Sequence, residues 1–187
     1  MDDRHIQLLG ISGSLRAEST NTRLLRAAKN FAPPGVDFHL TAKVAGLPLF
    51  NPDTDPAESD VVGQWIREVR AADGVIVSTP EYARGYPGAL KNALDWLVNT
   101  DAWIHKPFML LNASARSTVA QRTLTTVLET MSGIHIEAAS VTLPLLGTKM
   151  TVSQIVGNNE FAADIGRALQ TFAVAVQAQA AGSAHIA

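Results

Sequence analysis

Short apolar runs alternate along the chain with longer segments in which apolar residues recur at helical spacing. Residues 6–12 (IQLLGIS) are apolar at most positions, which predicts a strand buried on both faces. Residues 21–31 place Leu24, Leu25 and Ala28 on one stripe, which predicts an amphipathic helix. The chain therefore opens with a strand followed by a helix.

The same alternation continues through the rest of the chain. Pro80 closes the third apolar run, and a stretch rich in Pro and Asp at 46–60 predicts a long loop. We expect the tail from about residue 178, rich in Ala, Gln, Gly and Ser, to fray. The remaining strands are predicted at 36–43, 73–80, 106–114 and 134–143, and the remaining helices at 61–72, 87–98, 117–131 and 160–180.

Five successive strand and helix units predict a doubly wound α/β fold. Its parallel sheet would carry helices on both faces and form a single domain over residues 1–187. In such sheets ligands bind beyond the carboxyl ends of the strands, where the strand order reverses between the first and third strands. Two loops, 12–22 and 80–87, lie at that point.

Composition narrows the classes of function. The 187 residues are 47% hydrophobic, and the formal net charge of −2 gives no basic excess for a nucleic acid or an anionic membrane surface. No run reaches the roughly 18 apolar residues of a membrane helix. Without a signal-peptide core at the start, we expect a cytoplasmic protein with no nucleic-acid and no membrane partner.

Cysteine and histidine usage restricts the chemistry further. The chain has no cysteine, which excludes disulfides, thiolate metal sites and cysteine nucleophiles. Its five histidines show no ligand spacing and have no acidic cluster beside them, so we expect no metal site.

The first of the two loops suits a phosphate group. A turn from strand to helix presents backbone N–H groups at a helix N-terminus, which attract anions. Gly13 can take the positive φ of a tight wrap, and Arg16 can neutralise a dianion with a forked pair of hydrogen bonds. Hydroxyl groups are supplied by Ser12, Ser14, Ser19 and Thr22.

Other phosphate and nucleophile motifs do not fit this loop. It matches neither G-x-G-x-x-G nor G-x-x-x-x-G-K-[ST], and Ser14 stands where a G-x-S-x-G nucleophile elbow needs glycine. The alternative that Ser and Asn merely cap the helix remains open.

The second loop suits a flat ring. Pro80 ends a strand, and Pro87 starts a helix. At the first position of a helix a backbone N–H has no acceptor within the helix, so the missing N–H of proline is tolerated there. Between them, the backbone N–H groups of Glu81 and Tyr82 could face carbonyl acceptors on a planar heteroaromatic ring, with Tyr82 or Tyr86 against its face. Together the two loops predict a nucleotide with a flat heteroaromatic head.

Two motifs, GSLRAESTN and TPEYARGYPGALKNALDW, resemble the NADPH-dependent FMN reductase family, which includes quinone, azo and chromate reductases. The likeness covers most of the chain and is strongest over 6–98. It implies a three-layer flavodoxin-like fold with strand order 2-1-3-4-5, non-covalent FMN, NADPH or NADH as hydride donor, and a homodimer or homotetramer. It also implies phosphate-loop roles for Ser14, Arg16, Ser19, Asn21 and Thr22, and ring-edge roles for Pro80, Glu81 and Tyr82.

The chain departs from the family pattern in two places. Many members read P-E-Y-N-x-S-x-P-G, whereas this chain has Ala83 for the Asn and Gly85 for the Ser, so only backbone contacts of Ala83 could persist. The glycine-rich loop after the fourth strand is replaced by NASARSTVAQR, which has no glycine. Ser114, Arg116 and Ser117 there could line the ring or receive a phosphate, and Arg116 could equally be a plain surface charge.

The expected function is transfer of hydride from NAD(P)H through bound FMN to a quinone, an azo compound or free flavin. We expect ping-pong kinetics and name no catalytic side chain, because the cofactor carries the chemistry. Two alternatives are a flavodoxin-type electron carrier and a flavin-free phosphate- or nucleotide-binding module on the same scaffold.

Overall fold

The computed structural model describes residues 5–183 and contains six strands and six α-helices within that range. The strands are β1 (Ile6–Ser12), β2 (Val36–Leu40), β3 (Gly74–Ser78), β4 (Pro107–Asn112), β5 (Ile134–His135) and β6 (Val141–Thr142). The helices are α1 (Thr20–Ala28), α2 (Asp60–Ala71), α3 (Gly88–Asp95), α4 (Thr118–Thr130), α5 (Val152–Val156) and α6 (Asn159–Ser183).

The strands form one parallel sheet in the order β2-β1-β3-β4-β5, and β6 also pairs with β4. This confirms the predicted order. Strand β2 is added on one side of β1, and β3, β4 and β5 are added on the other side. The strand order therefore reverses between β1 and β3. The loops that follow these two strands therefore leave the sheet side by side at its carboxyl edge.

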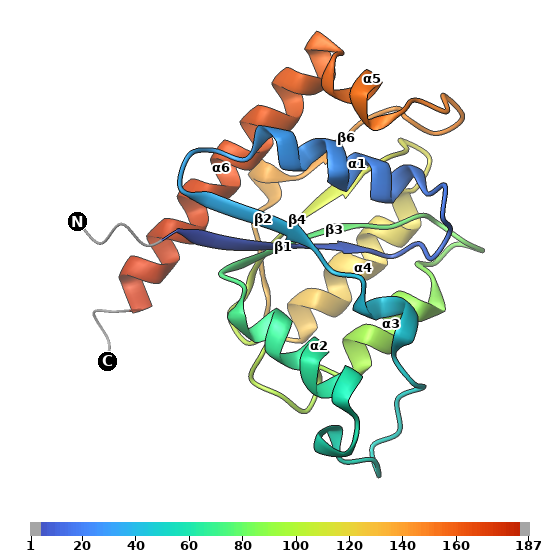
Figure 1. The fold of residues 1–187 in the computed structure, drawn as a ribbon, viewed down its shortest axis with the longest axis vertical. Coiled ribbons are helices and arrows are strands. Elements are labelled where there is room, and N and C mark those ends of the chain that lie inside the picture. Colours follow the sequence, from blue (N-terminus) through green and yellow to red (C-terminus); the bar gives the residue numbers. More distant parts are fainter. Residues whose placement is uncertain (1–4, 184–187) are drawn as a thin grey trace.

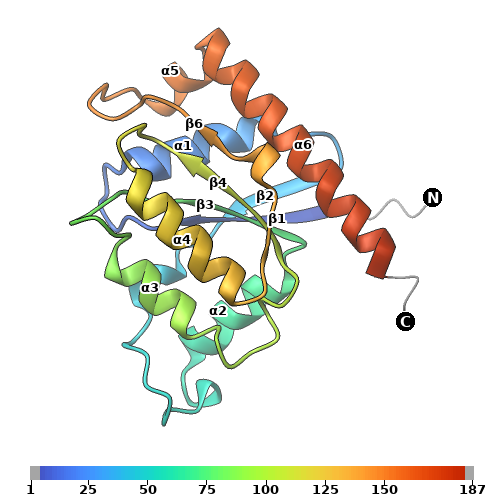
Figure 2. The same ribbon diagram turned by 180° about the vertical axis from the view of Figure 1, so that it is seen from behind.

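Helices cover both faces of the sheet in three layers (Figure 1). Helices α1, α5 and α6 lie on one face, and α2, α3 and α4 lie on the other, as the view from behind also shows (Figure 2). Alternate residues of each central strand point to opposite faces, so Leu8 joins the core under α1 and α6, while its neighbour Leu9 joins the core under α2 and α3. Both leucines are fully buried, so each face of the sheet is covered by its helices at this point.

The three tryptophans all belong to the second of these cores. Trp65 donates its indole N–H to the carbonyl of Ala93, and Trp103 donates to that of Leu128, at 2.8 and 3.0 Å. Trp96 reaches the carbonyl of Pro48 at 2.9 Å. Each buried ring thus satisfies its one polar atom and anchors a segment to the layer of α2, α3 and α4.

The fifth strand differs from the prediction. Residues 134–143 do not form one strand, because a 3₁₀ turn at Glu137–Ala139 separates β5 from β6. Glu and Ala have low strand propensity, which is consistent with a break there. The ladder is kept by a side chain, since Ser140 Oγ accepts the backbone N–H of Leu110 at 3.0 Å.

The carboxyl-terminal region also extends the prediction. Helix α5 was not expected, and it begins with a capping box in which Thr151 and Gln154 bond each other's backbone N–H. Helix α6 continues to Ser183, so residues 178–183 are helical rather than frayed, and the end of the predicted tail lies outside the described residues.

Gly74 at the start of β3 should not tolerate a side chain, because α6 packs directly on it. A Cβ there would lie 2.8 Å from Val176 Cγ2 and 2.9 Å from Phe172 Cζ. We expect Gly74→Ala to lower the free energy of unfolding by about 1–3 kcal/mol through overpacking. The matched control is Gly166→Ala in α6, where nothing lies within 4 Å, and stability should rise by about 0.5–1 kcal/mol. Urea unfolding followed by circular dichroism measures both, and equal stabilisation by the two substitutions would contradict the packing.

Candidate functional site

A hollow of about 160 Å³ lies beyond the carboxyl ends of β1, β3 and β4. These strand ends and their loops form the right-hand edge of the sheet in Figure 1. It is the edge at which the strand order reverses, where doubly wound sheets bind ligands. The hollow is lined from four segments, namely 14–21 after β1, 80–82 after β3, 112–117 after β4, and Leu146 in the loop before α5.

The first segment carries most of the residues predicted to hold a phosphate. Ser19 is the N-cap of α1, and its hydroxyl accepts the backbone N–H of Thr22 at 3.3 Å. The first turn of α1 contains no acidic residue to offset the positive end of the helix dipole, and the carboxylate of Glu18, the residue before the N-cap, is exposed and paired with Arg23. The lining residues of this segment are Ser14, Arg16, Ser19, Thr20 and Asn21.

Two predicted residues lie behind the wall of the hollow. The hydroxyl oxygens of Ser12 and Thr22 are 2.8 Å apart and share a hydrogen bond, and neither residue lines the hollow. Their contact ties the end of β1 to the first turn of α1. Arg16, in contrast, is exposed, and no acidic side chain within residues 5–183 pairs with its guanidinium.

Gly13 is required for a reason that differs from the predicted one. Its φ is not positive, so the expected left-handed conformation is wrong. Instead a Cβ at this position would lie 2.2 Å from Thr79 Oγ1, and the Gly13 N–H donates to the carbonyl of Ser78 at 2.9 Å. The buried Ser78 hydroxyl donates in turn to Asn21 Oδ1 at 3.0 Å. The ends of β1 and β3 and the start of α1 therefore form one rigid unit.

The second predicted loop folds as a miniature hairpin. Tyr82 and Gly85 exchange both backbone hydrogen bonds, at 2.8 and 3.0 Å, around Ala83 and Arg84. Both central residues have positive φ, of 49° and 65°, as a type I′ turn requires. The Tyr82 N–H that we expect to face a ring is therefore used inside the turn, whereas within residues 5–183 the N–H of Glu81 has no acceptor.

The side chains of this loop divide between the hollow and the core. Pro80, Glu81 and Tyr82 line the hollow, and Tyr82 is 50% exposed. Ala83 is at the tip of the turn, outside the lining. Tyr86 packs against the core of α2 and α3, where burial raises the pKa of its phenol, and it does not line the hollow.

The loop without glycine is held by its own side chains. Asn112 Oδ1 accepts the N–H of Ser114 at 3.1 Å, and Ser114 Oγ accepts the N–H of Arg116 at the same distance. Asn112, Ser114 and Ser117 are buried and line the hollow. Arg116 instead lines an adjoining hollow of about 340 Å³ that shares Ser114 and Leu146 with the first.

Sequence reasoning missed four lining residues. Thr20 and Asn112 are polar and sit at a helix start and a strand end, the same signal that singled out Ser114 and Ser117. Ala113 and Leu146 have no such signal, and Leu146 reaches the hollow only through the return of the chain after β6.

A family profile described as NADPH-dependent FMN reductase matches residues 6–145, which is most of the chain and includes three of the four lining segments. The chain belongs to the NADPH-dependent FMN reductase family.

Individual relatives agree with this family. An NAD(P)H-dependent FMN reductase of Pseudomonas aeruginosa is 41% identical over 113 residues, which are 59% of this chain and 60% of the relative. A 2-hydroxy-1,4-benzoquinone reductase of a Burkholderia species is 35% identical over 112 residues, 58% of this chain and 61% of the relative. The chain thus spans about 60% of the length of these curated relatives.

A solved structure supports the fold of the FMN reductase family. FerB, a flavoenzyme NAD(P)H:(acceptor) oxidoreductase from Paracoccus denitrificans, has a TM-score of 0.81 against this chain at 23% identity, covering 92% of this chain and 97% of FerB. With the observed strand order, this likeness confirms the flavodoxin-like fold.

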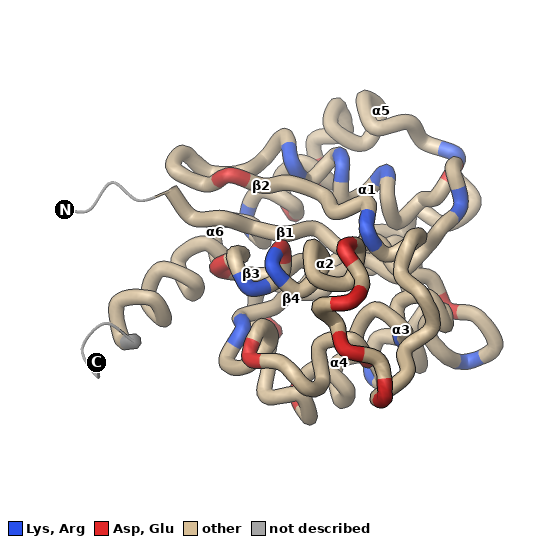
Figure 3. The backbone as a smooth tube through the Cα atoms, turned by 60° about the horizontal axis from the view of Figure 1, so that its bottom comes forward, with Lys and Arg blue, Asp and Glu red and all other residues tan. Residues whose placement is uncertain are grey.

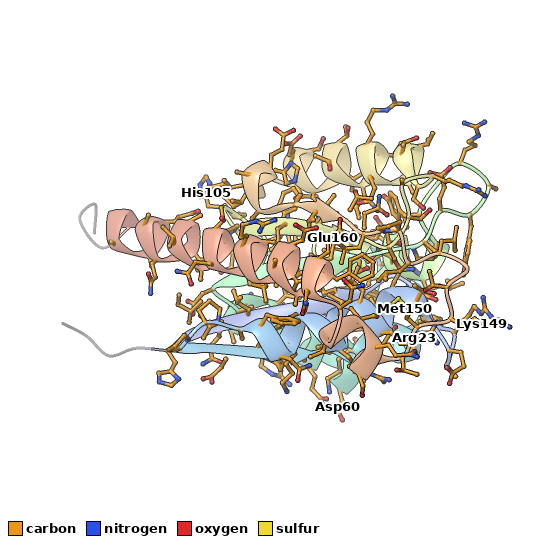
Figure 4. All side chains as sticks on the ribbon, turned by 90° about the horizontal axis from the view of Figure 1, so that it is seen from above. Arg23, Asp60, His105, Lys149, Met150 and Glu160 are labelled. Carbon is orange, nitrogen blue, oxygen red and sulfur yellow. The ribbon has the colours of Figure 1, made fainter. Side chains whose placement is uncertain are left out.

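A second hollow, of about 330 Å³, lies at the opposite edge of the sheet and holds none of the residues predicted for an FMN reductase site. Lys106 lines it, burial lowers the pKa of the Lys106 ammonium, and that group donates to the carbonyls of Ala72 and Arg70 at the end of α2. The Lys106 ammonium therefore caps the carboxyl end of α2. Figure 4 labels Lys149, in the loop before α5, and His105, in the loop before β4 and on the wall of this second hollow, toward opposite ends of the molecule.

Two further features bear on the class of site. Within residues 5–183, no three His, Asp or Glu side chains are grouped so that they could hold a metal ion. None of the helices in that range combines the length and apolarity needed to cross a bilayer. Figure 3 shows Lys and Arg positions interspersed with Asp and Glu positions along the backbone, with acidic positions gathered in the segment before α2.

The positive φ values of Ala83 and Arg84 give a test of the loop geometry in this member of the FMN reductase family. Asn tolerates the left-handed conformation better than Ala, so Ala83→Asn should raise the free energy of unfolding by roughly 0.5–1 kcal/mol. Ala115→Asn is the matched control, because Ala115 is also an exposed loop residue but has no positive φ. Equal shifts of the urea midpoint for both variants would show that the turn is not strained.

Proposed function

We propose that this hollow binds FMN and that the protein passes a hydride from NAD(P)H through the flavin to a small-molecule acceptor. The observation that carries the proposal is the meeting of an anion-binding loop and the Pro80–Tyr82 turn in one hollow of an FMN reductase family member. A quinone acceptor is supported by the relative that is named as a 2-hydroxy-1,4-benzoquinone reductase. Quinones, azo compounds and free flavin are the acceptors we propose.

The residues present fit FMN. Its phosphate would be held by the hydroxyls of Ser14 and Ser19, by the start of α1, whose first turn has no acid, and by the guanidinium of Arg16, which no acidic side chain within residues 5–183 pairs with. The flavin ring would meet the Glu81 N–H, which has no acceptor within residues 5–183. The hollow alone is smaller than the roughly 300–1,000 Å³ of typical ligand sites, but it joins the one lined by Arg116.

When bound, FMN supplies the hydride chemistry, and the protein contributes binding and orientation. Asn112, Ser114 and Ser117 would exclude water from one side of the hollow, since they are buried and bonded to their own loop. We assign no proton transfer to any side chain. Because donor and acceptor would use the same open mouth in turn, the oxidised nicotinamide leaves before the acceptor enters, which gives ping-pong kinetics.

The test is the visible absorption spectrum of the purified protein with and without added FMN, followed by anaerobic NADPH and NADH. Flavin bands that bleach promptly with either donor are the expected result. Bands that persist would favour an electron carrier that depends on a separate reductase. No binding even with excess FMN would leave a flavin-free phosphate- or nucleotide-binding module.

Arg16 allows the phosphate end to be tested alone. Arg16→Ala should weaken FMN binding about tenfold to a hundredfold, the loss of charged hydrogen bonds worth roughly 1.5–3 kcal/mol. Riboflavin, which lacks the phosphate, should bind both proteins equally. The control is Arg26→Ala, an exposed arginine further along α1, and an equal loss of FMN affinity in both variants would disprove the assignment.

We also propose that the protein forms a homodimer or homotetramer. The apolar residues of 90–98 offer little free surface for such an assembly, since Leu90, Leu94 and Leu97 are buried in the chain's own core. An apolar hollow of about 480 Å³ lies beside the ends of α3 and α4, and Val98 and Ile104 on its wall are 57% and 51% exposed. Such a surface is suited to a second copy of the chain.

We expect Ile104→Asp to shift the protein to monomers in size-exclusion chromatography with light scattering, because a charge at an apolar contact is costly to bury. Leu49→Asp is the control, since Leu49 is 86% exposed and lies outside this hollow. Monomeric wild type, or dissociation by both variants alike, would exclude this interface.

A further inference from the structure

Glu81 makes a contact that its place in the ring-edge turn does not require. Its Oε2 accepts the backbone N–H groups of Val119 and Ala120, at 3.0 and 2.9 Å. These are the second and third residues of α4, whose own N-cap, Ser117, makes no side-chain capping bond. Helix α4 is therefore capped by a carboxylate that comes from the loop after β3.

This cap distinguishes the two helix N-termini at the hollow. Helix α1 begins with a neutral hydroxyl cap and no acid in its first turn. Helix α4 begins with a carboxylate that occupies two of its free N–H groups and offsets its dipole. An anionic group is thus favoured at α1 and disfavoured at α4, which assigns the phosphate to the first loop and not to the loop of Ser114 and Arg116.

The same carboxylate is also what holds the turn. The backbone bonds of the miniature hairpin are internal, between Tyr82 and Gly85. Within residues 5–183, the hydrogen bonds that join residues 80–85 to any other element all run through the Glu81 carboxylate. Since Ala83 and Arg84 hold unfavourable φ values, a turn released from this tie would relax.

We propose that Glu81 is a positioning residue, whose carboxylate clamps the ring-edge turn to the glycine-free loop and sets the width of the flavin-ring site. The inference rests on the proposed function. Without the clamp, the binding-competent arrangement of the two loops is a smaller fraction of the population, and the apparent affinity for the ring falls by that fraction. The phosphate end, built on a different loop, is unaffected.

Riboflavin and FMN, which differ in the phosphate, test the ring end and the phosphate end of the site separately. Glu81→Ala should weaken the binding of riboflavin and FMN by a similar factor, about tenfold to a hundredfold, as expected for the loss of two charge-assisted hydrogen bonds. Arg16→Ala should weaken FMN alone. Glu81→Gln keeps an acceptor oxygen without the charge and should lie between, about three- to tenfold weaker than wild type. Glu129→Ala, which removes an exposed carboxylate at the other end of α4, should bind as wild type does.

Amide hydrogen exchange on the flavin-free protein gives a second readout. In Glu81→Ala the N–H groups of Val119 and Ala120 should lose protection, and so should the Tyr82 and Gly85 pair, which the carboxylate does not touch directly. Faster exchange at Val119 and Ala120 alone, with unchanged riboflavin affinity, would mean that Glu81 is only a helix cap, and would overturn the proposal.

The remaining outcomes are also decisive. If Glu81→Ala does not fold, the comparison of Glu81→Gln with wild type carries the test, and equal riboflavin affinity of those two proteins would overturn the proposal. If the wild type binds flavin and Glu81→Ala binds it equally, the positioning role falls while the proposed function stands. If the wild type binds neither FMN nor riboflavin, both fall together.

Discussion

The close approach of Gly13 to Thr79 is the contact on which the rest of the site depends. It lets the ends of β1 and β3 approach within backbone hydrogen-bonding distance, with Gly13 donating to Ser78. Asn21 then fastens the start of α1 to the same point. A larger residue at position 13 would separate the loop that we assign to the phosphate from the turn that we assign to the ring. The absence of a Cβ at Gly13 therefore sets the distance between these two loops.

The site is built from pieces that are rigid at their base and weakly tied at their tips. Ser12 and Thr22 fix the first loop behind the hollow, whereas the tip of the second loop bonds mainly to itself. This gradient suits the proposed mechanism, in which the same site would admit two different substrates in turn.

Much of this could be predicted from the sequence, because strand order, layer arrangement and loop chemistry follow from local patterns. Apolar runs and helical stripes indicate the sheet and its helices, and hydroxyls beside Arg16 indicate an anion. What could not be predicted depends on atoms that meet only after folding. The steric need for Gly13, the reach of Glu81 to α4, and the arrival of Leu146 at the hollow all join residues far apart in the chain. The break between β5 and β6 falls at the 3₁₀ turn Glu137–Ala139, and the ladder bond that Ser140 supplies beside it from its side chain also depends on a residue far away in the chain, Leu110.

The placement of the three tryptophans determines which part of the molecule intrinsic fluorescence can monitor. Trp65, Trp96 and Trp103 all lie in the core of α2, α3 and α4, and their indoles donate to the carbonyls of Ala93, Pro48 and Leu128. Intrinsic fluorescence therefore reports on one half of the protein. The layer of α1, α5 and α6 contains no indole within residues 5–183 and could loosen without changing that signal. Fluorescence and circular dichroism would coincide only if the two layers come apart in a single cooperative step.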